Sequence, residues 1–221
     1  MRRGWATIVG ILVLVLASLG NASAATTAPR VLLVIGDSLS AGYGLETGAG
    51  WVALLQHRLQ TRDPQWRVVN ASVSGETTAG GLSRLPGLLG RDKPQVVVVE
   101  LGGNDALRGL SLAATESNLR SIVSACREFG ARVLLLGMRI PPNYGPRYTD
   151  AFARIFPRVA RLEHASLVPF LLAGVVGHPG WFQHDDIHPT AQAQPEILDT
   201  VWPQLQPLLQ PPQSHTRQRR R

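Results

Sequence analysis

The chain has 221 residues, of which 44% are hydrophobic, 17% charged and 6% aromatic. This composition excludes disordered and collagen-like proteins, and the length suits one domain with a buried core better than two full-sized domains. The formal net charge is +7, but six of the arginines lie near the two chain ends, at positions 2, 3, 217, 219, 220 and 221. The body between them is nearly neutral, so the overall charge does not indicate a nucleic-acid-binding protein.

The N-terminal segment has the features of a secretory signal peptide. A short basic start, Arg2-Arg3, precedes an apolar run over residues 6–19, and Ala22-Ser23-Ala24 then supplies the small-x-small pattern that signal peptidase recognises. A membrane-spanning helix needs about 20 apolar residues, and this run is shorter. We therefore predict a signal peptide over residues 1–24, with cleavage after Ala24, and a periplasmic or secreted mature protein.

Five short and almost continuous apolar runs recur along the mature chain. Several of them lack the alternation of a half-exposed strand, and runs of this length are typical of strands covered on both faces. The runs extend from Val31 to Ile35, from Trp66 to Val69, from Val96 to Val99, from Val133 to Leu136 and from Leu167 to Phe170.

Helical patterns separate these runs. Apolar residues share one helical face before Pro64 and another before Gly130, which is typical of a helix C-cap. The second face includes Cys126, which we interpret as a small core residue, and a single cysteine excludes an intramolecular disulfide. A last apolar pattern extends from Ile197 to Leu205, and Pro203 is expected to kink or end that helix.

The alternation of these elements predicts the fold class. Strand, helix and strand repeated about five times indicate a parallel sheet with helices on both faces, a three-layer α/β/α sandwich over residues 25–210. Ligands of such sheets bind outside the carboxyl ends of the strands. The last segment, residues 211–221, is polar and basic with nothing to bury, and we predict that it is a disordered tail.

The first predicted strand leads directly into Gly36-Asp37-Ser38-Leu39-Ser40. A serine at the carboxyl end of a strand is well placed for a nucleophile, and Gly36 is expected to permit an unusual backbone angle there. The alternative is an ordinary strand-to-helix turn in which Ser38 or Ser40 caps the helix. The chain lacks a Gly-x-Ser-x-Gly motif, which disfavours the α/β-hydrolase form of serine catalysis.

A second polar group lies near the other end of the chain, in Asp185-Asp186-Ile187-His188-Pro189. On a single helical turn Asp185 lies on the same side as His188, so its carboxylate can hold the imidazole in one tautomer while the other ring nitrogen faces a serine. Asp186 points away on such a turn. Two alternatives stay open at this point: a surface turn capped by an aspartate, and a metal site built from His178, His184, Asp185, Asp186 and His188.

Two further segments follow predicted strands. The strand that begins at Val96 leads to Gly102-Gly103-Asn104-Asp105, where the glycines allow close backbone approach and the Asn104 amide can face a developing oxyanion. The second strand leads to Gly75, whose backbone N–H can face the same oxygen. Each segment alone is equally typical of an ordinary turn. Together, the four polar segments each follow a different predicted strand, at the face where such sheets bind ligands.

In this order the segments resemble the four blocks of the SGNH or GDSL hydrolases, which centre on Ser, Gly, Asn and His. The blocks here are Gly36-Asp37-Ser38-Leu39, Gly75, Gly102-Gly103-Asn104-Asp105 and the segment from Asp185 to His188. The resemblance covers nearly the whole mature chain. Stretches such as Ile140-Pro-Pro-Asn-Tyr-Gly resemble the periplasmic multifunctional thioesterase, lysophospholipase and arylesterase subgroup, and imply the flavodoxin-like fold of the family.

This resemblance implies a role for each residue of the four blocks. Ser38 is the nucleophile, His188 is the base, and Asp185 is the acid that orients it. The Ser38 and Gly75 N–H groups and the Asn104 side chain form the oxyanion hole. The implied reaction is the hydrolysis of acyl esters or thioesters through an acyl-enzyme on Ser38, which needs no cofactor and no metal.

The expected substrate is a small-molecule acyl ester or thioester. Leu107, Leu110, Ile140 and Pro141 follow predicted strands at the catalytic face, and we expect them to line an apolar groove for an acyl chain of medium or greater length. The alternative is that they only cover the edge of the sheet. We expect a monomer that binds no nucleic acid, with weak contact between the terminal arginines and anionic membrane surfaces.

Two other functional classes remain as alternatives at this point. One is a metal-dependent hydrolase that uses the histidines and aspartates between His178 and His188. The other is a non-catalytic periplasmic carrier of lipids or acyl chains.

Overall fold

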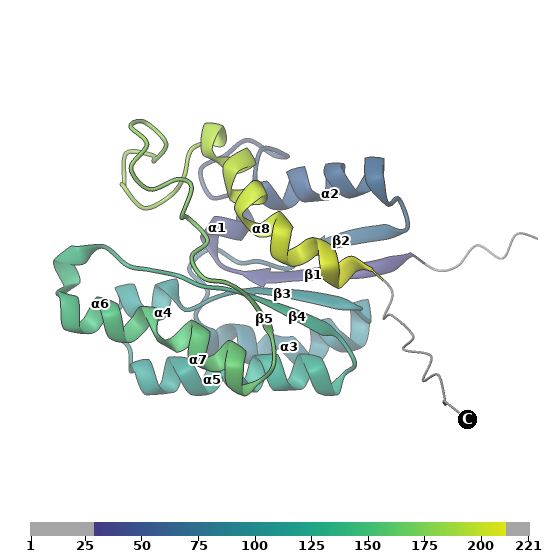
Figure 1. The fold of residues 1–221 in the computed structure, drawn as a ribbon, viewed down its shortest axis with the longest axis horizontal. Helices are drawn as coiled ribbons and strands as arrows, with labels where there is room; N and C mark the ends of the chain where they lie inside the picture. The colour runs from purple at the N-terminus through teal and green to yellow at the C-terminus, as the bar shows by residue number, and fades with distance from the viewer. Residues whose placement is uncertain (1–28, 211–221) are drawn as a thin grey trace, which may run out of the picture.

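Five parallel strands form one sheet in the order β2-β1-β3-β4-β5 (Figure 1). The computed structural model describes residues 29–210, so the predicted signal peptide (1–24) and basic tail (211–221) lie outside the described residues. All five apolar runs are strands, with these bounds: β1 (Arg30–Gly36), β2 (Trp66–Asn70), β3 (Val96–Glu100), β4 (Arg132–Leu136) and β5 (Ser166–Val168). The last strand ends before the predicted Phe170, because Pro169 has no N–H with which to continue the ladder.

Helices cover both faces of the sheet, as predicted (Figure 1). On one face α2 (Trp51–Arg62) packs beside α8 (Gln194–Leu209), and on the other α3 (Thr78–Asp92), α5 (Leu112–Glu128) and α7 (Ile155–Leu162) pack in sequence. The short helices are α1 (Ser38–Ala41), α4 (Gly103–Leu107), α6 (Pro146–Ala153) and two 3₁₀ turns, η1 (Pro142–Tyr144) and η2 (Ala191–Ala193). Among residues 29–210, no helix is long and apolar enough to cross a membrane.

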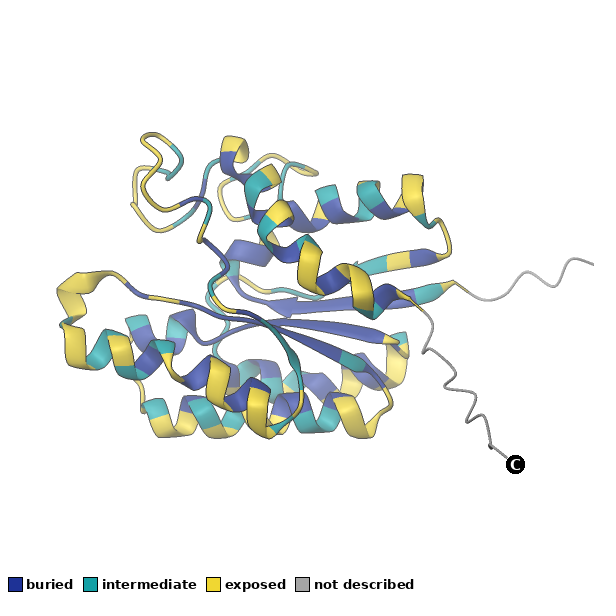
Figure 2. Ribbon diagram, viewed as in Figure 1, coloured by how far each residue is buried: buried dark blue, intermediate teal, exposed yellow. Residues whose placement is uncertain are grey.

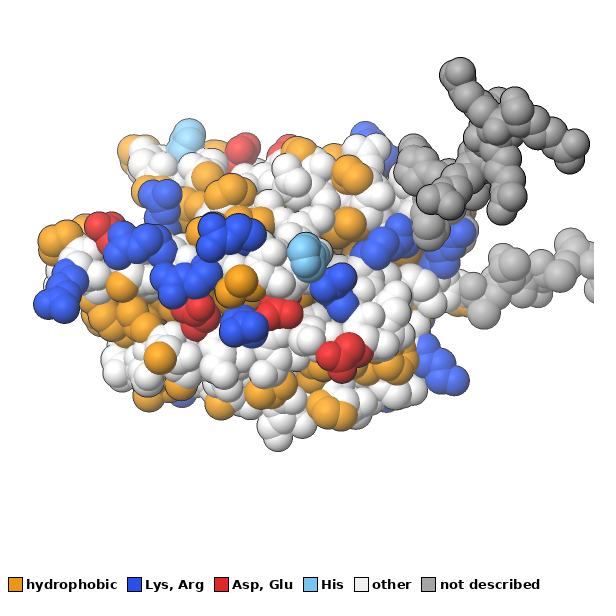
Figure 3. Space-filling model, turned by 60° about the horizontal axis from the view of Figure 1, so that its bottom comes forward, with side chains coloured by type: hydrophobic (Ala, Val, Ile, Leu, Met, Phe, Trp, Pro, Cys, Tyr) orange, Lys and Arg blue, Asp and Glu red, His pale blue; other side chains and the backbone are white. Residues whose placement is uncertain are grey.

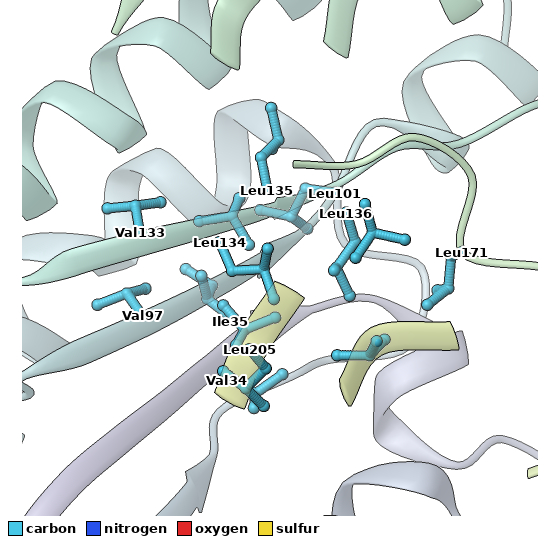
Figure 4. Packing of buried hydrophobic residues seen from close by; sticks show 14 of the residues in the cluster. Val34, Ile35, Val97, Leu101, Val133, Leu134, Leu135, Leu136, Leu171 and Leu205 are labelled. Carbon is cyan, nitrogen blue, oxygen red and sulfur yellow. The ribbon is translucent and has the colours of Figure 1, made fainter. Parts of the chain in front are cut away.

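The core lies between the two helical layers and is made largely by the central strands. Figure 2 shows β1 and β3 almost entirely buried, and Figure 4 shows their aliphatic side chains packing with Leu205 of α8. Each such side chain stabilises the fold by about 1.5–3 kcal/mol relative to leaving it in water. Cys126 of α5 is fully buried in this core, as expected, and burial raises the pKa of its thiol to about 12. The cysteine is therefore an inert packing residue.

Helix α8 does not end at Pro203. Of the two expected effects of this proline, a kink or an end, the end is wrong, because the helix continues to Leu209 with both Pro203 and Pro207 inside. Pro203 is exposed, while Ile197, Val201 and Leu205 are buried against the sheet. Burial of this face on every turn outweighs the helix-breaking effect of one proline, which is about 3 kcal/mol.

The strand order brings the site residues to one edge of the sheet. After β1 the chain continues to β2 on one side of the sheet, and after β3 it continues to β4 on the other side. In sheets of this kind, ligands bind between two such strands, outside their carboxyl ends. Gly36 is in register with Glu100, the last residue of β3. The segments that follow the two strands, with Ser38 and Asn104, therefore begin side by side.

Candidate active site

The nucleophile turn joins β1 to α1. Asp37 is the N-cap of α1, and its Oδ1 accepts a hydrogen bond from the Leu39 N–H at 3.1 Å. Ser38 is consequently the first residue of the helix rather than its cap, which leaves its hydroxyl group free for another partner. This position decides against the alternative in which Ser38 or Ser40 serves only as a cap.

Gly36 is required in this turn for a different reason from the one predicted. Its φ angle lies outside the left-handed region, so no unusual backbone angle is involved. A Cβ at this position would lie 2.8 Å from Oε2 of Glu100 and 2.9 Å from Cβ of Ser40. The absence of a side chain lets Glu100 and α1 pack directly against the end of β1.

His188 lies within hydrogen-bonding distance of the serine and of one aspartate. Its Nε2 is 2.8 Å from Oγ of Ser38, and its Nδ1 is 2.6 Å from Oδ2 of Asp185. Because an ionised carboxylate only accepts hydrogen bonds, Nδ1 carries the ring proton and Nε2 accepts the proton of the serine hydroxyl. The three side chains therefore form one continuous line from hydroxyl to carboxylate.

The segment that carries His188 is a turn, not the predicted helical turn. An isolated bridge between Phe182 and Pro189 closes it, and Asp186 adopts a left-handed φ of 56° that reverses the chain. Oδ1 of Asp185 accepts hydrogen bonds from the N–H groups of Ile187 and His188 at 3.0 and 2.9 Å. This Asx-type turn, rather than helical periodicity, brings Asp185 to the histidine ring.

The same turn explains the protonation state of Asp185. Partial burial raises the pKa of this carboxyl group, but the His188 N–H, the His188 ring and the Ile187 N–H outweigh it and lower the pKa to about 2. Asp185 is therefore ionised at neutral pH. Asp185 and Asp186 are both exposed, and it is the carboxylate of Asp185 that binds the ring.

Contacts outside the three residues hold the histidine turn against the nucleophile segment. The ring of Tyr43 packs on the imidazole of His188, with 4.6 Å between ring centroids. Nε2 of Gln183 donates to the carbonyl groups of Tyr43 and Pro189, at 2.9 and 3.2 Å. The buried Gln194 binds the Trp51 N–H at the start of α2 through its Oε1, at 3.0 Å. The sequence did not identify these residues, because a lone Tyr or Gln carries no motif.

Asn104 lies beside the nucleophile turn, at the second position of α4. Its Nδ2 donates to Oδ2 of Asp37 at 3.0 Å, which fixes one of the two amide hydrogens and leaves the other available. Asp105 anchors the same helix: its carboxylate binds Thr78 of α3 and lies near Thr115 of α5.

Gly75 lies in the loop after β2. This loop runs along the nucleophile turn, because the Val73 N–H donates to the Gly36 carbonyl oxygen at 3.0 Å. Gly75 has a left-handed φ of 79°, and Nη2 of Arg108 binds its carbonyl oxygen at 2.8 Å. Among residues 29–210, the N–H groups of Gly75 and Ser38 donate to no backbone or side-chain acceptor.

An apolar cavity of about 570 Å³ lies beside these groups. Ser38, Asn104 and His188 form its polar end. Leu107, Ile140 and Pro141 line it, as predicted, whereas Leu110 does not and is 45% exposed. The chain turns away after Gly109, which has a φ of 67°, so the expectation for Leu110 was wrong.

Several further apolar residues line the cavity. They come from the segment after β4 and from the long segment between β5 and α8. Apart from Phe170, which ends a predicted strand, no periodic pattern singled them out. They are Met138, Phe170, Leu172, Val176, Phe182 and Ile187.

The residues considered for a metal site do not gather around one point. His178 stacks on Trp181, with 4.2 Å between ring centroids, while Asp185 is bound to His188. Within residues 29–210, no three His, Cys, Asp or Glu side chains come together as metal ligands.

Comparison with known proteins agrees with this geometry. The sequence profile of the GDSL-like Lipase/Acylhydrolase family matches residues 34–194. The chain is 57% identical over 182 residues to the esterase TesA of Pseudomonas aeruginosa, covering 82% of this chain and 90% of that protein. It is 47% identical over 182 residues to the thioesterase 1/protease 1/lysophospholipase L1 of Escherichia coli K12, covering 82% and 86%.

A solved structure agrees as well. The crystal structure of TesA matches with a TM-score of 0.79 and 57% identity, over 81% of this chain and all of that one. The expected fold and the expected class, ester hydrolase, are thus confirmed. The residues after β1 and β3, the histidine turn before α8 and these matches lead to one conclusion: the chain belongs to the GDSL-like lipase/acylhydrolase family.

Proposed function

We propose that the chain is an exported serine esterase that hydrolyses acyl esters and thioesters through an acyl-enzyme on Ser38. The observation that carries this proposal is the line of hydrogen bonds from Ser38 through His188 to Asp185, at 2.8 and 2.6 Å, beside an apolar cavity. Such a line provides a hydroxyl group with a base, and the base with a carboxylate that orients it.

The reaction starts with proton transfer. Nε2 of His188 takes the hydroxyl proton as Oγ of Ser38 attacks the acyl carbonyl carbon, and the ionised Asp185 stabilises the imidazolium that forms. The imidazolium then gives its proton to the leaving alkoxide or thiolate, and the bond to the acyl carbon breaks. Water attacks the resulting acyl-serine with the same histidine as its base, and releases the carboxylic acid and Ser38.

The oxyanion of each tetrahedral intermediate needs hydrogen-bond donors. The Ser38 and Gly75 N–H groups are free of other acceptors among the described residues, and Asn104 has one amide hydrogen not used by Asp37. Three donors that are already held in place cost no reorganisation when the charge develops. We assign the oxyanion hole to these three groups.

The cavity supplies the acyl-binding part of the site. Leu107, Ile140 and Pro141 place apolar surface next to Ser38. Each methylene group buried there contributes about 0.8 kcal/mol, which corresponds to about fourfold in kcat/KM. The proposal therefore includes a preference for acyl chains of medium or greater length, carried by oxyesters, thioesters or lysophospholipids.

The test is turnover of p-nitrophenyl esters from acetyl to decanoyl, with and without a serine-directed phosphonate. We expect kcat/KM to rise with chain length until the cavity is filled, and the phosphonate to abolish turnover by forming one adduct, located on Ser38 by mass spectrometry. Ser38→Ala and His188→Ala are each expected to lose about 10⁴-fold or more in kcat with the fold intact.

The same experiment separates the alternatives. Loss of turnover on adding a chelator, with no phosphonate adduct, would establish a metal-dependent hydrolase. Binding of an acyl chain without turnover would establish a carrier. If kcat/KM did not change with acyl chain length, the serine mechanism would stand, but the cavity would not be the binding site of the acyl chain.

Export and membrane contact are further parts of the proposal. The basic and apolar segment over residues 1–24 supports export, and we expect the mature protein to start after Ala24, which N-terminal sequencing of the secreted form checks. Figure 3 shows Lys and Arg side chains gathered over the face that carries α6 and α7, where Arg147, Arg154 and Arg161 are exposed. These arginines support weak, salt-sensitive contact of a monomer with anionic membranes.

A further inference from the structure

A fully buried carboxyl group lies directly behind the nucleophile turn and has no part in the mechanism above. Glu100 is the last residue of β3 and is 0% exposed. Its Oε2 accepts hydrogen bonds from the Asp37 N–H at 3.1 Å and from Oγ of Ser40 at 2.8 Å. The missing Cβ of Gly36 is what makes room for this oxygen. The carboxyl group thus touches both ends of the turn that presents Ser38.

Glu100 also contacts a second buried carboxyl group, that of Asp37. Asp37 is only 3% exposed and its N–H binds Oε2 of Glu100, so two buried carboxyl groups lie next to each other. Within residues 29–210, neither group forms an ion pair with Lys or Arg. If both buried carboxyl groups were ionised, their charges would repel each other with no cation to offset them, and neither group could donate a hydrogen bond. One of the pair must carry a proton.

The surroundings decide which one. Asp37 accepts hydrogen bonds from the Leu39 N–H and from Nδ2 of Asn104, and it lies near His188, which becomes a cation during the reaction. Oε1 of Glu100, in contrast, is buried without any donor to accept from. A proton on Oε1 turns this unpaired acceptor into a donor, and Asp37 is the neighbouring group with a carboxylate to accept it. Glu100 is therefore the protonated member and Asp37 the ionised one.

The electrostatics of the pair point the same way. Burial raises the pKa of both groups, and for Glu100 the negative charge of Asp37 raises it further, well above the usual range of a glutamate. The other groups that face the pair are Ser40 of α1 and His188 of the loop before α8, with Asp185 behind it. None of them is a permanent cation that would favour an ionised Glu100.

We propose that Glu100 is a positioning residue that stays protonated and donates its carboxyl proton to Asp37, so that Asp37 holds the Asn104 amide in the orientation that the oxyanion needs. This inference rests on the proposed function, because it assigns Glu100 to the support of a proposed oxyanion donor. It also explains why a neutral acid is needed here. A second negative charge beside Asp37 would oppose the oxyanion that forms on the other side of Asn104.

The first test observes the proton itself. In protein labelled with ¹³C at the glutamate carboxyl groups, the chemical shift separates a protonated from an ionised carboxyl group, and Glu100→Gln assigns the Glu100 signal by removing it. We expect Glu100 to be protonated at pH 7 and Asp37, labelled in the same way, to be ionised. An ionised Glu100 at pH 7 would overturn the proposal. This measurement needs no turnover, so it stands whether or not Ser38 is the nucleophile.

The second test compares two replacements of Glu100. Gln keeps an acceptor for the Asp37 N–H and an N–H donor for the Asp37 carboxylate, so we expect kcat within about threefold of the wild type. Leu keeps the volume but removes donor and acceptor, so we expect kcat to fall about 10-fold to 100-fold with KM within about threefold. Equal losses of kcat in both variants would contradict the proposal, because the neutral N–H donor of glutamine would then fail to replace the protonated carboxyl group of Glu100.

The third test asks whether Glu100 acts through Asn104. With Asn104 already replaced by Ala, Glu100→Leu is expected to cost less than about threefold more in kcat, because the group that it positions is gone. A full 10-fold to 100-fold loss on that background would show that Glu100 acts by another route. Unfolding curves for each protein exclude loss of fold, and if Glu100→Leu does not fold, the chemical-shift measurement on the wild type decides alone.

Discussion

At the level of single residues, two adjacent aspartates have different surroundings, and this leads to a clear prediction. Asp185 binds the Nδ1–H of His188, whereas within residues 29–210 the carboxylate of the left-handed Asp186 accepts no hydrogen bond. Asp185→Asn keeps the shape but favours the wrong imidazole tautomer, so kcat is expected to fall by about 10⁴-fold, or somewhat less because this aspartate is partly exposed to water.

The matched control is Asp186→Asn, expected to stay within a few-fold of the wild type. Both variants are assayed with the same short ester, and circular dichroism checks that their folds match. A larger loss of activity in Asp186→Asn than in Asp185→Asn would show that the hydrogen bond between Asp185 and His188 does not contribute to catalysis.

The lowered pKa of Asp185 also predicts how stability depends on pH. An aspartate in an unfolded chain has a pKa near 3.8, and in the folded protein Asp185 has one of about 2. Its contribution to stability is complete above about pH 4 and is lost as the pH falls from about 4 to about 2. We therefore expect the difference in Tm between the wild type and Asp185→Asn to be constant above pH 4 and to shrink towards pH 2. A difference that does not change over this range would show that the pKa of Asp185 is not lowered by folding.

At the level of elements, α8 contains a proline that packing tolerates. Pro203 has no N–H for the carbonyl group of Asp199, and its exposed ring makes no contribution to the core. Pro203→Ala restores this hydrogen bond but gives the unfolded chain more freedom, so we expect the free energy of unfolding in urea to rise by about 1–2 kcal/mol. The control is Gln204→Ala at the exposed neighbouring position, which should change the free energy of unfolding by less than about 0.5 kcal/mol. No gain for Pro203→Ala would mean that α8 has already adjusted to the proline.

The elements that the sequence predicted are those with a repeating physical pattern. The buried strands are visible in the sequence as apolar runs such as Val96–Val99. Because β1 and β3 end at the same edge of the sheet, their positions alone predicted that Ser38 and Asn104 lie close together. In segments without a repeating hydrophobic pattern, the predicted local structure was wrong. The turn around Asp185 depends on side-chain to backbone hydrogen bonds, and the exposed Leu110 follows a glycine with a left-handed φ. Neither follows from hydrophobic patterning.

The carboxylate pair behind the site is a second kind of feature that patterning misses. Glu100 ends an apolar strand, and nothing in the sequence indicates that it contacts Asp37, 63 residues earlier. Only the register between β1 and β3 places the two carboxyl groups together. Long-range pairs of this type appear once the topology is known, since strand register, rather than local composition, determines them.

At the level of the whole molecule, the site and the core occupy different parts of one sheet. The middle of β1 and β3 is wholly buried, and the chemistry begins only at their last residues, Gly36 and Glu100. The nucleophile turn and α4 are therefore attached to the most deeply buried strands of the sheet. The histidine turn is the exception: it comes from the exposed segment before α8 and depends on Gln183 and Tyr43 for its position. We expect the site to lose its geometry first at this turn when the protein is heated.

The charge distribution over the whole chain leads to the last prediction. Residues 211–221 carry four of the arginines and no acidic residue, so most of the net positive charge after residue 24 belongs to this segment, and its composition offers little that a core could bury. Deleting them is expected to leave Tm and ester turnover unchanged, and to weaken sedimentation with phosphatidylglycerol vesicles at low salt, since each arginine near an anionic surface contributes about 1 kcal/mol. A shortened chain with a clearly lower Tm would show that this segment packs on the domain. Unchanged vesicle binding would assign the membrane contact to the arginines of α6 and α7 instead.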